Sequence, residues 1–396
     1  MEKRVYKNIF DLVKHLRDDT PSSPLVGDSD AYEWVDYRDF LDESYEWIDC
    51  GFDQTGGRLM PSMHSPYLYR GQTEQHSRCY PKVYRDFPPV NRPRELKEEY
   101  RTMYLSSQIR ILWFISLLKE HPAMEHARQF GIQINPIALA QHYGIPTHYL
   151  DLTQSIDVAA FFAWCKSENK VWQPVDRGQG VIYRFCWVKI PEAWKMIEVV
   201  GLLTFPRPGE QKAWVVPIRL GGNFEKVPHV ETFTFKHTLE GSTHFFDMFD
   251  SGKALFPEDP AADIADSIMS ITVIPTNFVV HTLLQFGCAP FKLEETFKVF
   301  QGRLLCYCNL TVENEVPIAL TKEQLEKLAA YWSKREKDFL RNVGVHAVKI
   351  IEKGEMLTQA EAVRLLGISR DSLKKRIIDG TLKAIRVFKV GSNQGR

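Results

Sequence analysis

The chain has 396 residues, of which 44% are hydrophobic and 25% are charged. This is the composition of a folded globular protein, and it excludes a disordered or fibrous chain. One hydrophobic core rarely spans so many residues, so we expect two or more units. Lys+Arg and Asp+Glu each number 50, which excludes a chain that is basic or acidic as a whole.

The cysteines and the apolar runs indicate the compartment. The seven cysteines include no CxxC pair, which favours reduced thiols in the cytoplasm over a disulfide framework or a zinc site. The longest mainly apolar runs, such as residues 111–118, are much shorter than a membrane span. We therefore expect a cytoplasmic protein with no membrane segment and no bound metal.

Residues 1–60 are predicted to form an N-terminal extension. It begins with a short amphipathic helix and continues into an acidic segment with interspersed aromatic residues, AYEWVDYRDFLDESYEWIDC. Apolar residues on one side of a solvated segment are typical of packing against a neighbouring surface. We assign this extension a packing role.

Residues 61–320 show a mixed pattern that predicts an α+β domain, with helices early and strands late. Apolar residues at helical spacing predict helices over residues 95–120, 136–143 and 156–165. Strand-like segments are predicted over residues 181–190, 213–218, 230–236, 271–274 and 303–312. Residues 321–352 follow as a charged helical linker, opened by Thr321 with Glu323 and Gln324 in its first turn.

Residues 353–396 are predicted to form a separate small unit. A capping box, Thr358-x-x-Glu361, begins one helix and Gly367 ends it, and Ser369 caps a second helix that Gly380 ends. Residues 382–388 then alternate as a β wing would. Residues 352–396 carry ten Lys/Arg against five Asp/Glu, a net charge of about +5 that leaves about −5 for the rest of the chain.

This tail resembles the winged helix-turn-helix of the excisionase and MerR family, without the closing helix that is common there. The resemblance implies binding to duplex DNA through basic residues of the second helix and the wing. Those residues are Arg370, Lys374, Lys375, Lys383 and Arg386. Modules of this kind also serve as protein-binding adaptors, and that alternative stays open.

The stretch QHYGIPTHYLDLTQSIDVAAFFA, residues 141–163, concentrates polar side chains between two helices. Gly144 and Pro146 end the first helix, which places His142 in its last turn, where a histidine often satisfies free carbonyl groups. A short strand over residues 147–152 precedes the second helix, which Ser155 or Thr153 caps. Asp151 and Thr153 can therefore be helix caps or members of a site.

Three separated blocks resemble the FRG-domain family over residues 61–220. They are Tyr69-Arg70-Gly71, then His142 to Thr147 with Leu150 to Thr153, and then Arg207-x-x-x-Gln211. The order of an arginine strand, a hydroxyl strand leading into a helix, and a third strand containing Gln and Glu is also similar to the ADP-ribosyltransferase pattern. The resemblance implies a mixed fold of helices and antiparallel strands, similar to that of ADP-ribosyltransferases.

That similarity assigns expected roles. In the transferase pattern an arginine fork binds the NAD pyrophosphate, hydroxyl side chains position the ribose, and a carboxylate stabilises the positive charge that develops there. The implied catalytic residues are Arg70, His142, Asp151, Thr153, Glu210 and Gln211. The implied cofactor-binding residues are Arg70, Gly71, Tyr143, Thr153 and Ser155. Ala213 stands where the catalytic glutamate is expected, so Glu210 or Asp151 replaces it, or the domain binds a nucleotide without turnover.

Two functions follow as hypotheses. The first is an NAD-using transferase that a DNA-binding tail carries to its target, in a toxin or phage-defence setting. The second is a non-catalytic DNA-binding regulator whose FRG domain senses a nucleotide ligand or a protein partner, as a monomer or an oligomer. Both predict that Arg70, His142, Asp151 and Gln211 approach one cleft.

Overall fold

A computed structural model describes most of the chain. The described residues are 5–19, 45–49, 57–61, 66–90, 92–129, 134–168, 171–190, 197–200, 205–336, 363, 369, 372 and 373. Most of the acidic segment and most of the basic tail, including Arg370 and Lys374, lie outside them.

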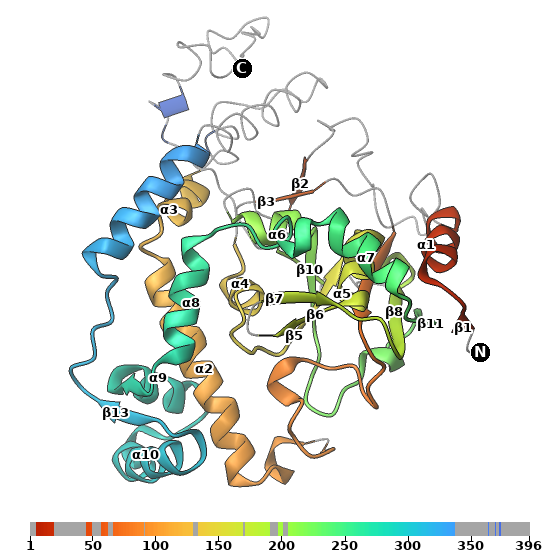
Figure 1. The fold of residues 1–396 in the computed structure, drawn as a ribbon. Coiled ribbons are helices and arrows are strands. Elements are labelled where there is room, and N and C mark those ends of the chain that lie inside the picture. The colour runs from red at the N-terminus through yellow and green to blue at the C-terminus, as the bar shows by residue number, and fades with distance from the viewer. Residues whose placement is uncertain are drawn as a thin grey trace, which may run out of the picture.

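A seven-stranded sheet forms the centre of the fold (Figure 1). Its spatial order is β1 (Val5–Tyr6), β11 (Val230–Lys236), β8 (Gln179–Cys186), β4 (Tyr67–Gln72), β5 (Tyr149–Thr153), β10 (Ala213–Pro217) and β9 (Glu198–Val199). The neighbours pair antiparallel, except that β1 runs parallel to β11. The mixed α+β class expected from the sequence is confirmed.

In the described part of the chain, three pairs of short strands lie outside this sheet. They are β2 (Tyr45–Asp49) with β3 (Gly57–Pro61), β6 (Cys165–Glu168) with β7 (Val171–Pro174), and β12 (Val273–Pro275) with β13 (Thr311–Glu313). The β6–β7 pair is antiparallel and directly follows α5 (Ile156–Trp164), so it is tied to the central sheet through that helix.

The helices form two groups. Along one side of the molecule run α2 (Glu98–Leu118), α3 (Pro122–Gln129), α8 (Pro260–Ser270), α9 (Thr276–Gln285), α10 (Leu293–Cys308) and the helix over residues 322–336 (Figure 1). Beside the sheet lie α1 (Ile9–Asp18), α4 (Pro136–His142), α5, α6 (Pro206–Glu210) and α7 (Leu239–Met248). Short 3₁₀ helices are η2 (Lys82–Tyr84), η3 (Pro93–Glu95), η4 (Trp187–Lys189), η6 (Phe224–Lys226), η7 (Asp250–Gly252) and η8 (Pro290–Lys292).

Alternation along β4 sends side chains to both faces of the sheet. Tyr67 and Tyr69 join the cluster under α1, α5 and α7, whereas Leu68 joins the cluster on the opposite face with Phe224. This is the period of two that a strand buried on both faces shows. The helix α5 is buried almost all round, as its nearly continuous apolar sequence predicts.

At Gly71, β4 lies very close to α5. A Cβ atom at Gly71 would lie 1.8 Å from the carbonyl oxygen of Ala159 and 2.7 Å from the backbone nitrogen of Ala163. Both neighbouring atoms belong to the backbone of α5, which cannot move aside as a side chain can. The glycine of the Arg70-Gly71 motif therefore has a packing role.

The C-terminal part of the predicted domain differs from expectation. Residues 303–312 were predicted as a strand, but α10 continues to Cys308, and only Thr311–Glu313 form a strand. Phe300 and Leu304, four residues apart, bury one face of the helix, and Asn309 ends it in a left-handed conformation. The expected order of helices before strands is also wrong, because α7, α8, α9 and α10 follow most of the sheet.

The helix over residues 322–336 begins as predicted. The Thr321 hydroxyl accepts from the Gln324 backbone N–H, and the Gln324 side chain accepts from the Thr321 N–H. Leu328 and Trp332 are buried in one cluster with side chains of α2, α4 and α8. Leu373 belongs to the same cluster, so the tail contacts the body of the protein at that residue.

The Ser369 cap predicted in the tail is present. The Ser372 N–H donates to the Ser369 hydroxyl at 3.1 Å, and the Leu373 N–H donates to the Ser369 carbonyl at 2.9 Å. Among the helices that the structure describes, none is both long enough and apolar enough to span a bilayer.

A buried histidine gives the fold a pH dependence. His121 is fully buried against Phe205, and desolvation lowers its pKa from 6.5 to about 4. The unfolded chain therefore binds more protons than the folded chain between those values, and stability falls as pH falls through this window. We expect the free energy of unfolding of the wild type to fall by about 2 kcal/mol between pH 7 and pH 5 because of His121.

Urea unfolding of the wild type and His121→Gln at both pH values measures that cost. The glutamine oxygen can still accept the Ala123 N–H, which donates to His121 Nδ1 at 3.0 Å, but it does not titrate. If the free energy of unfolding falls equally in both proteins from pH 7 to pH 5, His121 does not cause the pH dependence.

Candidate functional site

A pocket of about 390 Å³ opens where β4, β5 and the β6–β7 pair meet. It is lined by Tyr69, Arg70, Gly71, Gln72, Thr73, His76, Arg85, Gln141, His142, Asp151, Leu152, Thr153, Phe162, Cys165, Lys166, Ser167, Trp172, Gln211 and Phe256. The prediction that Arg70, His142, Asp151 and Gln211 approach one cleft is confirmed as geometry.

Two guanidinium groups face this pocket. Arg70 Nη1 donates to the Asp151 backbone carbonyl at 2.8 Å, which orients the side chain, and its buried Nε has no hydrogen-bond partner among the described residues. Arg85 follows η2 and also lines the pocket. Desolvation and the like charge of Arg70 both lower the pKa of Arg85, with the Asp151 carboxylate acting in the opposite direction. An anion placed between the two arginines would relieve this repulsion.

The Asp151 carboxylate is held by its neighbours in a defined orientation. The Gln141 amide oxygen accepts from both the backbone N–H and the hydroxyl of Thr147, at 3.1 and 3.0 Å. Its amide nitrogen is thereby turned toward Asp151 and donates to Oδ2 at 3.0 Å. The other carboxylate oxygen, Oδ1, lies 3.5 Å from Nε2 of His142.

His142 is nearly inaccessible, with 3% of its side chain exposed. Desolvation lowers its pKa, although the nearby Asp151 charge and a hydrogen bond with Gln211 act in the opposite direction. The ring is therefore neutral near pH 7. Within the described residues, neither His142 Nε2 nor Asp151 Oδ1 forms a hydrogen bond, although the two atoms lie 3.5 Å apart.

Thr153 and Gln211 close the inner end of the pocket. The Thr153 hydroxyl donates to the Gln211 carbonyl at 2.7 Å and accepts from the Ser155 backbone N–H at 3.0 Å. Gln211 Nε2 donates to the Leu255 carbonyl at 3.0 Å, which turns the amide oxygen toward His142. These bonds join β5 to the start of β10 and to the segment before α8.

Aromatic rings form the other wall. Trp172 of β7 stacks on Phe256 at a centroid distance of 5.1 Å and an interplanar angle of 29°. Phe162 of α5 meets both rings, at 5.7 Å from Trp172 and 6.2 Å from Phe256. A pocket with cations on one side and aromatic rings on the other suits a ligand that has an anionic part and a planar part.

Comparison with known protein families matches residues 65–171 to the FRG domain. The chain contains an FRG domain. The matched segment includes Arg70, Gly71, His142, Asp151 and Thr153, and it ends before Gln211 and Phe256. Neither the curated proteins nor the solved structures gave a match to this chain.

We call the pocket between β4, β5 and the β6–β7 pair the FRG pocket. Two residues that were expected to bind a cofactor there lie elsewhere. The Tyr143 hydroxyl donates to the carboxylate of Asp259, which caps α8, and Arg207 lies over the Tyr143 ring at 5.0 Å. Ser155 is the N-cap of α5, where its side chain accepts from the Val158 N–H at 3.3 Å. The sequence suggested cofactor roles for both, but neither side chain lines the pocket.

Glu210 also lies outside the FRG pocket. The third block was expected to be a strand, but residues Pro206–Glu210 form the short helix α6, and Glu210 is exposed at its end. Ala213, at the position expected for a catalytic glutamate, is buried at the start of β10. Asp151 is thus the one carboxylate among the residues that line the pocket in the described part of the chain.

Sequence reasoning missed several pocket residues. Gln141 stands next to His142 in the same block, and its place in the last turn of a helix was a usable signal. Arg85, Lys166 and Phe256 come from segments without a recognisable motif, so only the fold brings them together. Within the described residues, no group of three or more His, Cys, Asp or Glu side chains could hold a metal ion.

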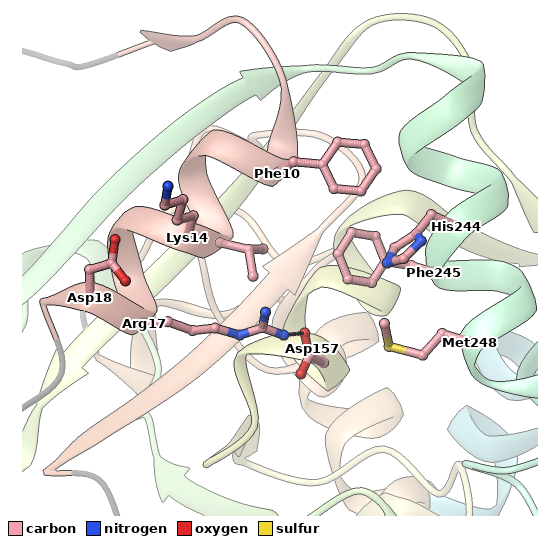
Figure 2. A pocket seen from close by; sticks show the side chains of 9 residues that line it. Phe10, Lys14, Arg17, Asp18, Asp157, His244, Phe245 and Met248 are labelled. Carbon is pink, nitrogen blue, oxygen red and sulfur yellow. Dashed lines mark hydrogen bonds and ion pairs between the residues drawn. The ribbon is translucent and has the colours of Figure 1, made fainter. Parts of the chain in front are cut away.

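A second cavity, of about 440 Å³, lies between α1, the start of α5 and α7. Figure 2 shows Arg17 and Asp157 pointing toward each other across it, and they form an ion pair. Phe10 and Phe245 supply apolar walls. Lys14 and Asp18 add opposite charges at the rim, so the charges there balance and favour neither an anion nor a cation.

Proposed function

We propose that the FRG domain binds a nucleotide of the NAD type in the pocket between β4 and β5 and acts as an ADP-ribosyltransferase-like enzyme. The observation that carries this proposal is the pair Arg70 and Arg85. Both line one pocket, and within the described part of the chain neither forms an ion pair with a carboxylate. Guanidinium groups that lack a protein counterion suit the phosphates of a nucleotide.

The other walls of the pocket fit the remaining parts of such a ligand. Phe162, Trp172 and Phe256 offer flat surfaces for an aromatic base. Polar side chains of Thr73, Gln141 and Thr153 also line the pocket. A ligand with several polar groups can form hydrogen bonds with such a lining.

Asp151 is the residue that supports transfer chemistry. NAD supplies an ADP-ribosyl group whose transfer develops positive charge at a ribose carbon. A carboxylate oriented by Gln141 can stabilise that charge without rearranging during the reaction. The Asp151 side chain is 37% exposed, so its carboxylate is accessible from the pocket.

The direct test is incubation of the full-length protein with NAD, followed by mass measurement of the protein, of added DNA and of the released small molecules. A mass gain of one ADP-ribosyl group, or free nicotinamide, is the expected result. Saturable NAD binding without any product would leave a binding domain and reject the transferase. No binding at millimolar NAD would reject the nucleotide assignment itself.

A regulator that does not catalyse a reaction is the second candidate, and Leu373 favours it. This tail residue is buried in the cluster that also contains Leu139, Ala140 and Tyr143 of the segment leading into the pocket. A ligand that shifts α4 could therefore alter how the tail is held. DNA affinity that changes with NAD while no product forms would support the regulator over the enzyme.

We also propose, from the sequence, that the tail binds duplex DNA. Lys383→Ala should weaken binding about equally on all sequences and lower the salt dependence, because a phosphate contact is lost. Arg370→Ala, at the start of the second helix, should reduce the preference for one base pair by about 1–3 kcal/mol. Fluorescence anisotropy with the full-length protein at several salt concentrations measures both effects. If the wild type ignores DNA even at low salt, the tail is a protein-binding adaptor.

A further inference from the structure

The segment that follows β4 carries three cations without a counterion. Arg78 is half-buried, whereas Lys82 in η2 and Arg85 directly after it are exposed. Within the described residues, none of the three forms an ion pair with a carboxylate. This segment, residues 74–86, also passes beside the FRG pocket, because Arg85 lines that pocket.

The turn between β10 and β11 places a fourth cation beside this segment. The Cys79 N–H donates to the Asn223 side chain at 2.9 Å, and the Phe224 N–H donates to the Cys79 carbonyl at 2.8 Å. These bonds hold the two segments together, so Arg78 and Arg219 line one small hollow. Arg219 is exposed and also lacks an ion pair within the described residues. We call these four cations the basic strip: Arg78, Lys82, Arg85 and Arg219.

The acidic residues near the basic strip are fewer than the basic ones. Residues 74–86 and 218–226 together contain five Lys/Arg and three Asp/Glu, in a chain whose formal net charge is zero. Glu225 accepts from the Tyr183 hydroxyl at 2.6 Å and from the Gln75 side chain at 3.1 Å, whereas Glu74 and Asp86 are exposed. The strip is therefore a local excess of positive charge, which attracts an anionic partner.

The hollow between Arg78 and Arg219 is too small for a side chain of a partner. Its volume is about 10 Å³, which barely holds one water molecule. Tyr84 and Phe87 form its floor, and both rings are buried in a core cluster. A partner can therefore contact only the guanidinium groups at the surface. Phosphate groups suit such a surface, because a guanidinium can donate two parallel hydrogen bonds to phosphate oxygens.

The basic strip is continuous with the FRG pocket. Tyr84 lines the hollow, and Arg85, the next residue, lines the pocket. Trp172 and Phe256 stack on each other in the far wall of the pocket and offer a flat surface to a base. Bases of a duplex are stacked on one another, whereas an unpaired base is free to stack on an aromatic side chain. The combination of strip and pocket therefore favours a single strand over a duplex.

We propose that the basic strip binds the phosphate backbone of a single-stranded nucleic acid and leads one of its bases to the mouth of the FRG pocket. Arg78, Lys82 and Arg219 do not line that pocket. The binding needs no NAD, so it stands apart from the proposed transferase activity. It is also a different surface from the basic tail.

The test is fluorescence anisotropy of the full-length protein with a labelled single strand of about 12 nucleotides, as DNA and as RNA, without NAD. The double variant Arg78→Ala/Arg219→Ala should bind the strand about tenfold more weakly than the wild type. The slope of log affinity against log salt concentration should become less steep by about 1.4, because two phosphate contacts of about 0.7 each are lost. Tail residues are the same in both proteins, so they do not cause the difference.

Lys7→Ala/Lys14→Ala is the matched control. Both lysines are exposed and lie in or beside α1, which packs on the face of the sheet opposite Cys79. This variant loses the same charge and should keep the wild-type affinity. An equal loss in both variants would show attraction by net charge alone and would overturn the proposal. No binding by the wild type at low salt would overturn it as well.

Two further comparisons test the kind of partner. An equal loss of affinity for the duplex of the same sequence would overturn the assignment to single strands. Binding of a poly-glutamate peptide that depends on Arg78 and Arg219, with no effect of these residues on the oligonucleotide, would assign the surface to an acidic protein segment. NAD affinity of the Arg78→Ala/Arg219→Ala variant should equal that of the wild type, which also shows that the variant is folded.

Acetylation of Lys82 in the wild type locates the strand without any substitution. Lys82 is exposed in η2, so it reacts in the free protein. A saturating oligonucleotide should lower its rate of acetylation at least fivefold, as measured by mass spectrometry of peptides. Lys7 should react at the same rate with and without the strand. Unchanged reactivity of Lys82 would place the strand elsewhere and overturn the proposal.

Discussion

Gly71→Ala is expected to destabilise the protein by at least about 3 kcal/mol, the largest effect on folding that we predict. The added Cβ would meet the Ala159 carbonyl oxygen at 1.8 Å, well inside the contact distance of the two atoms. To relieve this clash, β4 must separate from α5, and Tyr69 and Phe161 of the same buried cluster then lose contacts. Urea unfolding, followed by circular dichroism, measures the change.

Gly302→Ala is the matched control for that experiment. Gly302 lies within α10, and a Cβ there would meet no atom within 4 Å. Alanine favours a helix by about 1 kcal/mol over glycine, so this variant should be slightly more stable than the wild type. If Gly71→Ala also proved neutral or stabilising, the close approach of β4 and α5 would not be a feature of the folded protein.

Arg70→Lys is expected to weaken NAD binding by about 30- to 100-fold while the protein remains folded. The guanidinium uses Nη1 to bond the Asp151 carbonyl and keeps further N–H groups for a ligand. A lysine ammonium is a compact charge and cannot hold both positions in that fixed geometry. Net charge is unchanged, so the loss reports geometry and not electrostatic attraction at long range. Titration calorimetry measures the affinity.

Arg17→Lys supplies the comparison for Arg70→Lys. Arg17 lines the cavity beside α1, where an ammonium can keep the ion pair with Asp157. The NAD affinity of the Arg17→Lys variant should match that of the wild type. Unchanged affinity in both variants would contradict the assignment of Arg70 to phosphate binding and would leave it as a residue that links β4 to β5.

The sequence predicted the parts of the fold in which local signals agree with packing. The predicted start of α4 at Pro136 and the Thr321 cap are borne out because capping depends on neighbouring residues. Strand β11 matches its predicted limits because its alternation is regular. The strand prediction for residues 303–312 was wrong because their apolar residues fit a strand as well as a buried helix. Only the packing of α10 on α2 distinguishes the two.

The site was predictable to the extent that its residues stand in recognisable blocks. Arg70, His142 and Asp151 stand in such blocks, and the structure brings them to one pocket. Arg85 and Phe256 belong to no such block. They reach the pocket because distant loops return to the sheet. The prediction that Glu210 belongs to the site was wrong for a local reason. Pro206 starts a helical turn, and this turn places the Glu210 carboxylate in solvent.

The strand order has a consequence for where this FRG domain ends. Within the matched segment, β4 and β5 share one register pair, Tyr69 with Thr153, whereas β4 pairs along its whole length with β8, which lies after residue 171. β5 likewise pairs along its whole length with β10. A polypeptide cut to residues 65–171 would therefore have two strands with their main neighbours missing and unpaired backbone groups on both sides. The matched segment thus covers only part of the central sheet, whose strands continue along the chain to β11 at Lys236.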